Sequence, residues 1–354
     1  NKKNCDLMNI NGKKLGLNFK PFIVAEISAN HGGSIHKVLK IVDAAANAGV
    51  DAIKLQTYTA DTITINSNKK NFIIKDKNSL WKNRSLHSLY EEAHTPWEWH
   101  KKIFDRAKKR KILCFSAPFD VTAVDFLSKL DVPCFKIASS ECIDIPLIEK
   151  VAKTNKPIIV STGMATEKEI NEAIKTIKKN GRSKYALMKC TASYPAKEEE
   201  LNLATINYMR KKFKCEVGFS DHSISNVAAI SSIAHGATFI EKHIVIKKND
   251  NVLDAKFSAD PNQFKDLVRD TYLAWLSIGK KKFGPTLSEK SSIKYRRSLY
   301  IVKEVKKGEI ISNKNIRSIR PSGGLLPKNF KKVIGKKFKK SANIGTPLKW
   351  NLIK

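Results

Sequence analysis

Short apolar runs alternate along this chain with longer amphipathic segments. Each run is rich in Ile, Val, Ala or Phe and is followed by polar or turn-forming residues. Strands that are buried on both faces of a parallel sheet have this continuous apolar character. We therefore predict strands over residues 22–28, 52–58, 112–118, 134–139, 157–163, 185–191, 216–222 and 238–244.

The segments between these runs have the spacing of amphipathic helices. In residues 166–180, apolar side chains recur at intervals of three and four, and Thr166 with Glu169 forms a capping box. Glycines stand where helix C-terminal caps are expected, at Gly49, Gly181 and Gly236. Helices are predicted over segments that include residues 34–48, 96–110, 122–130, 166–180 and 225–235.

Eight strand–helix units in succession predict a (β/α)8 (TIM) barrel. A doubly wound open sheet is the alternative, but the Gly-x-Gly-x-x-Gly of a dinucleotide-binding fold does not follow the first strand. The longest connection, residues 61–95, follows the second strand on the side of the C-terminal strand ends. We expect it to lie over the barrel mouth as a lid or a substrate-contacting segment.

The pattern changes after Gly284. Residues 295–302, 309–311 and 316–321 have the character of short strands separated by turns. We therefore divide the chain into a barrel domain, residues 1–284, and a small β-rich domain, residues 285–354. The second domain has little core of its own, so we expect it to lean on the barrel or on another subunit.

The chain is strongly basic, with 66 Lys and Arg against 33 Asp and Glu and a formal net charge of +33. The excess is mainly Lys and is spread along the chain, whereas nucleic-acid-binding modules cluster Lys and Arg with interleaved aromatic residues. We expect no nucleic-acid partner. The charge can still attract an anionic substrate to a cationic cleft.

The sequence has neither a membrane-spanning stretch nor a cysteine motif typical of disulfide or zinc frameworks. Its apolar stretches stay shorter than the roughly 18 residues of a membrane-spanning helix, and residues 1–14 have no signal-peptide core. We expect a cytoplasmic protein without a membrane partner. The six cysteines form no Cys-x-x-Cys pair, so we interpret them as small buried hydrophobes rather than a disulfide or zinc framework.

Nearly every predicted strand ends in polar residues. The C-terminal strand ends of such a barrel converge on one mouth, where catalytic groups are placed. This convergence favours an active site over a series of unrelated helix caps. The residues concerned include Glu26, Lys54, Gln56, Lys136, Ser139, Glu141, Ser161, Ser220, His222, Glu241 and His243.

Two of these residues, Lys54 and Lys136, interrupt apolar strands. Buried lysines are rare unless they are paired. With serines around them, the two cations would suit a phosphate or a phosphate plus a carboxylate. A salt bridge to neighbouring carboxylates inside the barrel is the alternative, and spacing alone does not decide between them.

His222 and His243 end the last two predicted strands, which are neighbours in the barrel. Two imidazoles at one rim, with Glu26 or water completing the shell, would suit Mn²⁺, Mg²⁺ or a similar ion with open positions rather than a closed zinc site. The alternative is that each is a neutral, hydrogen-bonded residue.

These residues lie in segments that resemble the motifs of the sialic acid synthase (N-acetylneuraminate synthase-like) family. Within that family, residues 92–100, 116–120 and 253–258 resemble the pseudaminic acid synthase branch, and the tail around Arg320 and Pro321 resembles the antifreeze-like (SAF) domain. The resemblance covers nearly the whole chain. The family motifs are residues 25–31, 52–58, 135–139, 159–164, 218–222 and 240–243.

The resemblance implies an enzyme that joins phosphoenolpyruvate to an amino-sugar aldehyde, with release of phosphate by C–O cleavage. It implies a divalent metal, Mn²⁺ first and Mg²⁺ or Co²⁺ as alternatives, and a domain-swapped homodimer. N-acetylneuraminate or legionaminate synthase is the rival function. The resemblance also implies a role for each candidate residue. Phosphoenolpyruvate would be bound by Lys54, Lys136, Ser139, Ser161 and Ser220, and the metal by His222 and His243. Glu26 would orient the substrate or metal-bound water, Glu141 would transfer a proton, Gln56, Tyr194 and Asp254 would contact the sugar, and Arg320 would reach into a partner subunit's barrel.

Two positions depart from the family pattern. Ala117 and Ala192 are apolar where the family often has a hydroxyl or an amide near the phosphate. Either those contacts are missing, or neighbours such as Ser116 and Ser193 make them. A SAF-type binding protein with an inactive barrel is disfavoured, because the set of polar strand ends is intact.

Overall fold

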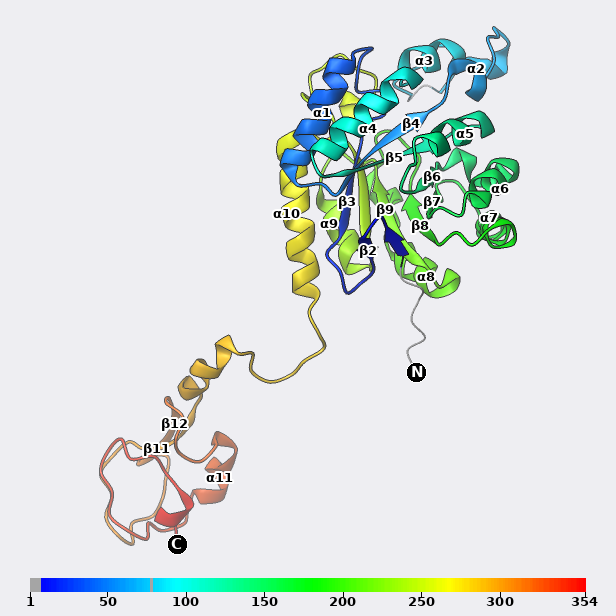
Figure 1. Ribbon diagram of the computed structural model, residues 1–354. Helices are drawn as coiled ribbons and strands as arrows, with labels where there is room; N and C mark the ends of the chain where they lie inside the picture. Colours follow the sequence, from blue (N-terminus) through cyan, green and yellow to red (C-terminus); the bar gives the residue numbers. More distant parts are fainter. Residues whose placement is uncertain (1–7, 77–78) are drawn as a thin grey trace. The chain divides into compact units, whose positions relative to one another are not determined.

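The computed structural model describes residues 8–76 and 79–354 of the chain. Eight parallel strands close into a barrel in the order β10-β3-β4-β5-β6-β7-β8-β9, with helices outside it (Figure 1). The predicted TIM barrel is therefore confirmed. The strands are β3 (Phe22–Glu26), β4 (Ala52–Thr57), β5 (Leu113–Pro118), β6 (Phe135–Ile137), β7 (Ile158–Ser161), β8 (Tyr185–Cys190), β9 (Glu216–Asp221) and β10 (Phe239–His243).

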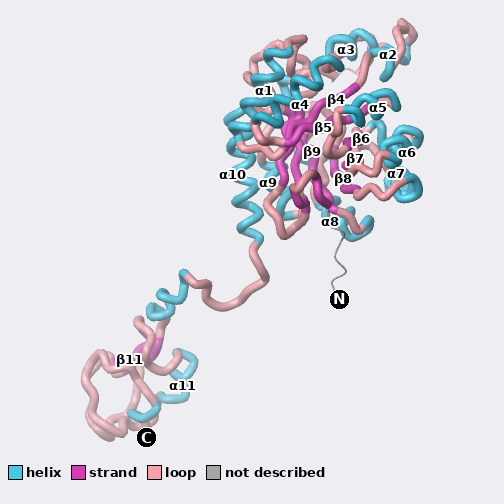
Figure 2. The backbone as a smooth tube through the Cα atoms, in the orientation of Figure 1, coloured by secondary structure: helices cyan, strands magenta, loops and turns pink. Residues whose placement is uncertain are grey.

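The outer helices follow the strands in turn, and Figure 2 shows them surrounding the strands. The predicted capping box at Thr166 and Glu169 is present at the start of α7. Gly49 ends α1 in the left-handed conformation, with φ of 89°. The helices are α1 (Ile35–Ala48), α4 (His100–Lys109), α5 (Val121–Lys129), α6 (Ile145–Lys153), α7 (Glu167–Asn180), α8 (Ala204–Phe213), α9 (Val227–Ala234) and α10 (Pro261–Ile278).

Gly181 also ends a helix, but for a different reason. Its backbone is extended rather than left-handed. A Cβ at this position would lie 2.1 Å from the carbonyl oxygen of Ala152 in α6. Close approach of two helices, and not a left-handed turn, therefore requires glycine here.

The N-terminal end of the barrel is filled by apolar side chains. A hairpin of β1 (Met8–Ile10) and β2 (Lys13–Leu15) contributes Met8, Ile10 and Leu15 to one buried cluster with Phe22 and Phe239 of the barrel strands. A second cluster lies between the strands and the outer helices. Apolar side chains thus fill the barrel at the N-terminal ends of its strands, and the inward-facing polar side chains lie toward the C-terminal strand ends.

The long connection after β4 forms a small folded segment. It holds α2 (Ala60–Ile63), the short 3-10 helix η1 (Lys70–Phe72) and α3 (Leu86–Ala93). An antiparallel bridge joins Ile73 to Ser85, and Ser85 caps the start of α3. The segment lines the same pocket as the strand ends, as predicted from its place in the sequence.

Residues 280–354 form a separate compact unit with its own core of buried residues, including Leu299, Ile311 and Phe338. Its two strands, β11 (Ser298–Ile301) and β12 (Ile316–Ile319), pair antiparallel. Predicted strand 309–311 is only an isolated bridge between Ile310 and Lys337. The remaining elements are α11 (Phe330–Val333) and the 3-10 helices η2 (Trp97–Trp99), η3 (Ser140–Ile143), η4 (Glu198–Glu200), η5 (Ala255–Phe257), η6 (Ser288–Tyr295), η7 (Pro327–Asn329) and η8 (Trp350–Leu352).

Two further expectations concern the described residues as a group. None of their helices combines the length and the apolar character needed to cross a bilayer. The five cysteines among them are buried, as predicted, whereas Cys5 lies outside the described residues.

Candidate active site

Alternation along the strands determines which polar side chains enter the barrel. Phe22 and Phe239 belong to the inner apolar cluster, so residues two and four positions further along the same strands also face inward. This parity brings Glu26 of β3 and Glu241 of β10 into the interior. The same rule applied to the other strands directs Lys54, Gln56, Lys136, Ser161, Cys190 and Ser220 inward.

Glu241 joins the two buried lysines. Its Oε1 atom lies 2.9 Å from Lys54 Nζ and 3.6 Å from Lys136 Nζ. The Glu26 carboxylate lies 2.5 Å from Lys54 Nζ on the other side. All four side chains are at most 5% exposed. The salt-bridge alternative raised from the sequence therefore describes the geometry of both lysines.

The serines complete this network. Lys136 Nζ donates a hydrogen bond of 2.7 Å to Ser161 Oγ, and Ser220 Oγ donates one of 3.1 Å to Glu241. An anion that entered from above would therefore meet ammonium and hydroxyl groups together. It would compete with Glu241 for the lysine donors.

The buried charges shift one another's protonation. Burial lowers the pKa of Lys54 to about 8, although Glu241 opposes the shift. Burial alone would raise the pKa of Glu241, but Lys136 and Lys54 outweigh it and hold that pKa well below its usual range. The contact between Lys54 and Glu241 is thus between charged groups at neutral pH.

His222 and His243 stand together above the network, with ring centroids 5.4 Å apart. His222 Nδ1 lies 2.9 Å from the Thr191 carbonyl oxygen, which leaves Nε2 as its other ring nitrogen. His243 Nδ1 is buried and has no hydrogen-bond partner among the described residues. Burial lowers the pKa of His243 well below its ordinary value, so its imidazole is neutral.

A neutral, unpartnered imidazole nitrogen beside a second imidazole fits a divalent metal ion. Within residues 8–76 and 79–354, no cluster of three or more His, Cys, Asp or Glu side chains could hold such an ion. The two imidazoles would therefore supply part of the coordination shell, and water or substrate the rest.

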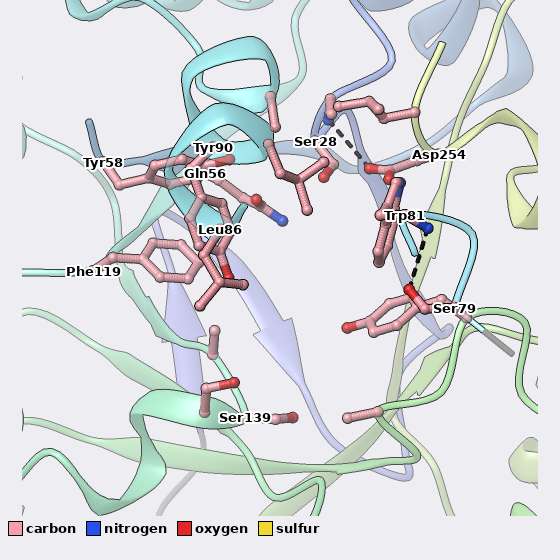
Figure 3. Close-up of a pocket in the computed structure, with 18 of the residues that line it drawn as sticks. Ser28, Gln56, Tyr58, Ser79, Trp81, Leu86, Tyr90, Phe119, Ser139 and Asp254 are labelled. Carbon is pink, nitrogen blue, oxygen red and sulfur yellow. Dashed lines mark hydrogen bonds between the residues drawn. The ribbon is translucent and has the colours of Figure 1, made fainter. Parts of the chain in front are cut away.

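A cavity of about 490 Å³ opens at this end of the barrel. It brings together residues for which the sequence predicted a sugar contact, a phosphate contact, proton transfer or metal binding: Gln56, Ser139, Glu141, Tyr194, His243 and Asp254. Figure 3 shows Tyr58, Tyr90, Leu86 and Phe119 together with Gln56 on one side of this cavity, Asp254 and Trp81 on the other, and Ser139 below them in the view.

Two acidic residues of the cavity have a higher pKa than an ordinary surface carboxylate. Burial raises the pKa of Glu141 to about 7, and its Oε2 atom has no hydrogen-bond partner among the described residues. Burial also raises the pKa of Asp254, whose Oδ2 atom accepts a hydrogen bond of 3.2 Å from the Ala29 amide. Glu141 can thus hold a proton near neutral pH.

Comparison with known proteins identifies the family. The NeuB family model matches residues 41–283, and the SAF domain model matches residues 296–354. The chain belongs to the NeuB family. The predicted resemblance is confirmed over both parts of the chain.

Curated members of the NeuB family resemble the chain over most of its length. Pseudaminic acid synthase of Campylobacter jejuni strain 81-176 is 44% identical over 93% of this chain and 96% of its own. The Helicobacter pylori pseudaminic acid synthase is 39% identical over 93% and 96%. The N,N'-diacetyllegionaminic acid synthase of Campylobacter jejuni is 34% identical over 90% and 95%.

Solved NeuB-like structures agree with this fold. N-acetylneuraminic acid synthetase from Leptospira borgpetersenii superposes with a TM-score of 0.73 at 31% identity, over 81% of this chain and 95% of that one. Spore coat polysaccharide biosynthesis protein SpsE from Bacillus subtilis gives 0.66 at 30% identity, over 98% and 99%.

Three more expectations concern Arg320 and the serines next to Ala117 and Ala192. Arg320 is exposed and belongs to the separate unit of residues 280–354. Ser116 Oγ is 2.6 Å from Thr57 Oγ1, outside the inner cluster that holds Phe115, so it does not stand in for the apolar Ala117. Ser193 Oγ donates to the Pro195 carbonyl, whereas Ala192 lines the cavity.

Sequence reasoning gave no role to Glu241 and overlooked the apolar residues of the cavity. The inward direction of Glu241 could have been predicted, because it precedes His243 by two positions on the same strand and therefore faces the same side of the sheet. The sequence carried no such signal for Trp81, and the helical spacing of Leu86 within α3 did not show that this face meets the cavity. Their position depends on how that segment folds back.

Proposed function

We propose that this chain condenses phosphoenolpyruvate with 2,4-diacetamido-2,4,6-trideoxy-L-altrose to give pseudaminic acid and phosphate. The supporting observation is the 44% and 39% identity to two pseudaminic acid synthases, against 34% to a legionaminic acid synthase, each over at least 90% of the chain. The chain would thus be a transferase that forms a C–C bond. The buried lysine–serine network agrees with an anionic substrate.

Phosphoenolpyruvate would lie above that network. Lys54 and Lys136 would neutralise its phosphate and carboxylate, and Ser139, Ser161 and Ser220 would donate hydrogen bonds. The substrate would take over ammonium contacts that Glu241 now makes. Two fixed cations lower the repulsion that the trianion would otherwise exert on an approaching nucleophile.

The reaction balances as phosphoenolpyruvate plus sugar plus water giving the nine-carbon acid plus phosphate. C3 of phosphoenolpyruvate bonds to the aldehyde carbon of the open-chain sugar, and the aldehyde oxygen takes up a proton. Water adds to C2, gives up a proton, and the C2–O bond to phosphate breaks. Neutral Glu141 would donate the proton to the aldehyde oxygen, and Glu26 would orient the reacting groups through Lys54.

A metal ion completes the proposed site. His222 and His243 would hold it, with Mn²⁺ expected first and Mg²⁺ or Co²⁺ as alternatives. When bound, it supplies Lewis-acid polarisation of the aldehyde. Gln56, Tyr194 and Asp254 would position the sugar beside it.

We also propose the arrangement of the whole protein. Residues 1–284 would make up the synthase domain and residues 285–354 the SAF domain. Arg320 would reach the barrel of a second subunit in a domain-swapped, cytoplasmic homodimer. The match of the SAF model to residues 296–354 supports the second domain.

The test is to incubate the enzyme with phosphoenolpyruvate, Mn²⁺ and each candidate hexose, and to measure phosphate release and the sugar acid formed. We expect turnover of 2,4-diacetamido-2,4,6-trideoxy-L-altrose. Preference for N-acetylmannosamine or a legionaminate precursor would overturn the assignment. In ¹⁸O-labelled water, label should enter the sugar acid, and label in the phosphate would contradict C–O cleavage.

A further inference from the structure

One side of the cavity is an apolar wall, which we define as Tyr58, Ile74, Leu86, Leu89, Tyr90 and Phe119. None of these side chains carries a charge. Of the acidic residues that line the cavity, Glu141 and Asp254 come from the loops after β6 and β10, and Asp76 follows Ile74 by two positions. Figure 3 shows Tyr58, Tyr90, Leu86 and Phe119 gathered together, across the cavity from Asp254.

The wall is built by packing and is not a chance exposure of apolar side chains. Leu86, Leu89 and Tyr90 are three and four positions apart on α3, so they share one helix face. Tyr58 packs edge-on against Tyr90 at a centroid distance of 5.6 Å and against Phe119 at 5.1 Å. The wall therefore joins α3 to the ends of β4 and β5.

Backbone hydrogen bonds hold the remaining member in place. The Ile74 amide donates to the Arg84 carbonyl at 2.9 Å, and the Asn83 amide donates to the Ile74 carbonyl at 2.8 Å. This pairing fixes Ile74 beside the start of α3. The helix face of α3, the ring contacts of Tyr58 and the backbone hydrogen bonds of Ile74 together give the wall a fixed shape.

The polar atoms of the wall side chains are two phenol hydroxyls. Neither the Tyr58 nor the Tyr90 hydroxyl has a hydrogen-bond partner within the described part of the chain. Burial raises the pKa of both phenols, so both keep their protons and can donate. Such donors suit the carbonyl oxygens of acetamido groups, while the aliphatic members suit methyl groups.

We propose that the apolar wall selects sugars that carry a methyl group at C6 instead of a hydroxymethyl group. This inference rests on the proposed function and names the feature of the substrate that the site reads. A C6 hydroxyl packed against the aliphatic members Leu86, Leu89 and Ile74 would lose its hydrogen bonds to water, because these three side chains have no polar atoms to replace them. An apolar pocket rejects an added hydroxyl by about 10²-fold.

The experiment measures kcat/KM for 2,4-diacetamido-2,4,6-trideoxy-L-altrose and for the same sugar with a C6 hydroxyl. The unaltered enzyme should prefer the 6-deoxy sugar by about 10²-fold. Leu86→Asn places an amide in the wall and should lower that preference by about tenfold, mainly through better use of the hydroxylated sugar. Glu91→Gln, an exposed position on the same helix, should keep the original ratio.

Ile74→Thr is the second variant, to be used if circular dichroism shows that Leu86→Asn does not fold. It should lower the preference in the same direction, because it places a hydroxyl in the wall. Equal use of both sugars by the unaltered enzyme, or an unchanged ratio in a folded wall variant, would overturn the inference. Inactivity toward both sugars with turnover of another hexose would instead overturn the proposed function.

Discussion

At the scale of residues, the centre of the site is a carboxylate shared between two ammonium groups. Glu241 contacts Lys54 and Lys136 in a part of the barrel where all three side chains are nearly inaccessible. A buried cation that loses its partner carries the full cost of its desolvation. Glu241 therefore contributes to stability as well as to the placement of the lysines.

Replacement of Glu241 tests this coupling. Glu241→Gln keeps the shape but removes the charge, and should lower the free energy of unfolding by about 3–5 kcal/mol. Asp43→Asn removes a partly exposed partner of Arg106 and should cost less than about 1 kcal/mol. Urea unfolding followed by fluorescence compares the two. Equal losses would contradict the coupling.

The pKa of Glu141 gives a pH dependence. Burial raises that pKa to about 7, so the carboxyl is protonated below this pH and ionised above it. If the neutral form donates a proton, kcat/KM should be level at low pH and fall tenfold per pH unit above about 7. The profile of kcat/KM against pH measures this directly.

Glu141→Gln is the matched variant for that profile. It should reduce kcat/KM by about 10²–10⁴-fold and remove the fall near pH 7. A later fall near pH 8 should remain, since Lys54 has a pKa of about 8 and loses its charge there. Persistence of the fall near pH 7 in the variant would exclude Glu141 as its cause.

The imidazole pair is tested by direct metal binding. His222→Ala and His243→Ala should each weaken Mn²⁺ binding by at least about tenfold, measured by isothermal titration calorimetry in the absence of substrate. His235→Ala, at the C-terminal end of α9, is the control and should bind as the unaltered enzyme does. Unchanged Mn²⁺ affinity in the double variant would remove the metal proposal.

At the scale of elements, strand alternation separates inward from outward groups on β9 and β10. Glu241 and His243 face the interior, whereas Lys242 between them donates to Asp221 outside it. Gly218 leaves room for the ring of Phe239 on the neighbouring strand. A Cβ at position 218 would lie 2.6 Å from that ring and from the Phe239 carbonyl oxygen.

Gly218→Ala should therefore destabilise the barrel by about 1–3 kcal/mol through overpacking. Thermal unfolding measures the change. Combination with Phe239→Leu should recover part of the loss, because a smaller side chain yields to the new methyl group while the carbonyl contact stays. A double variant less stable than the sum of the single changes would contradict this explanation.

At the scale of the whole molecule, the proposed contact of Arg320 with a partner barrel predicts complementation. Arg320→Ala should reduce activity by about 10²–10³-fold, as loss of an electrostatic stabiliser does. Lys54→Met should inactivate the barrel that carries it. Co-expression of the two variants should restore activity, since an intact barrel would receive an intact Arg320 from its partner.

The control is co-expression of two different barrel variants, Lys54→Met and His222→Ala, which share no intact barrel. That pair should stay inactive. Activity should follow the fraction of mixed dimer isolated with two affinity tags. If mixed dimers of Arg320→Ala and Lys54→Met are inactive, Arg320 does not act between subunits.

The sequence by itself determined the barrel and most of the strand-end chemistry. Continuous apolar runs and amphipathic intervals specify eight strand–helix units, because burial on both sheet faces leaves few other arrangements. The identities of Lys54, Lys136 and the two imidazoles followed from their places at strand ends. Local spacing also specified the capping box of α7.

Only the tertiary structure decided what these groups contact. Whether Lys54 meets phosphate or carboxylate depends on Glu241, which lies far away in the sequence and closes the barrel beside β3. The apolar wall depends on the fold of residues 61–95: helical spacing places Leu86 and Tyr90 on one face of α3, but it does not determine what that face meets. Contacts between segments that are distant in the sequence form only when the barrel closes and the loops pack, so local sequence patterns do not predict them.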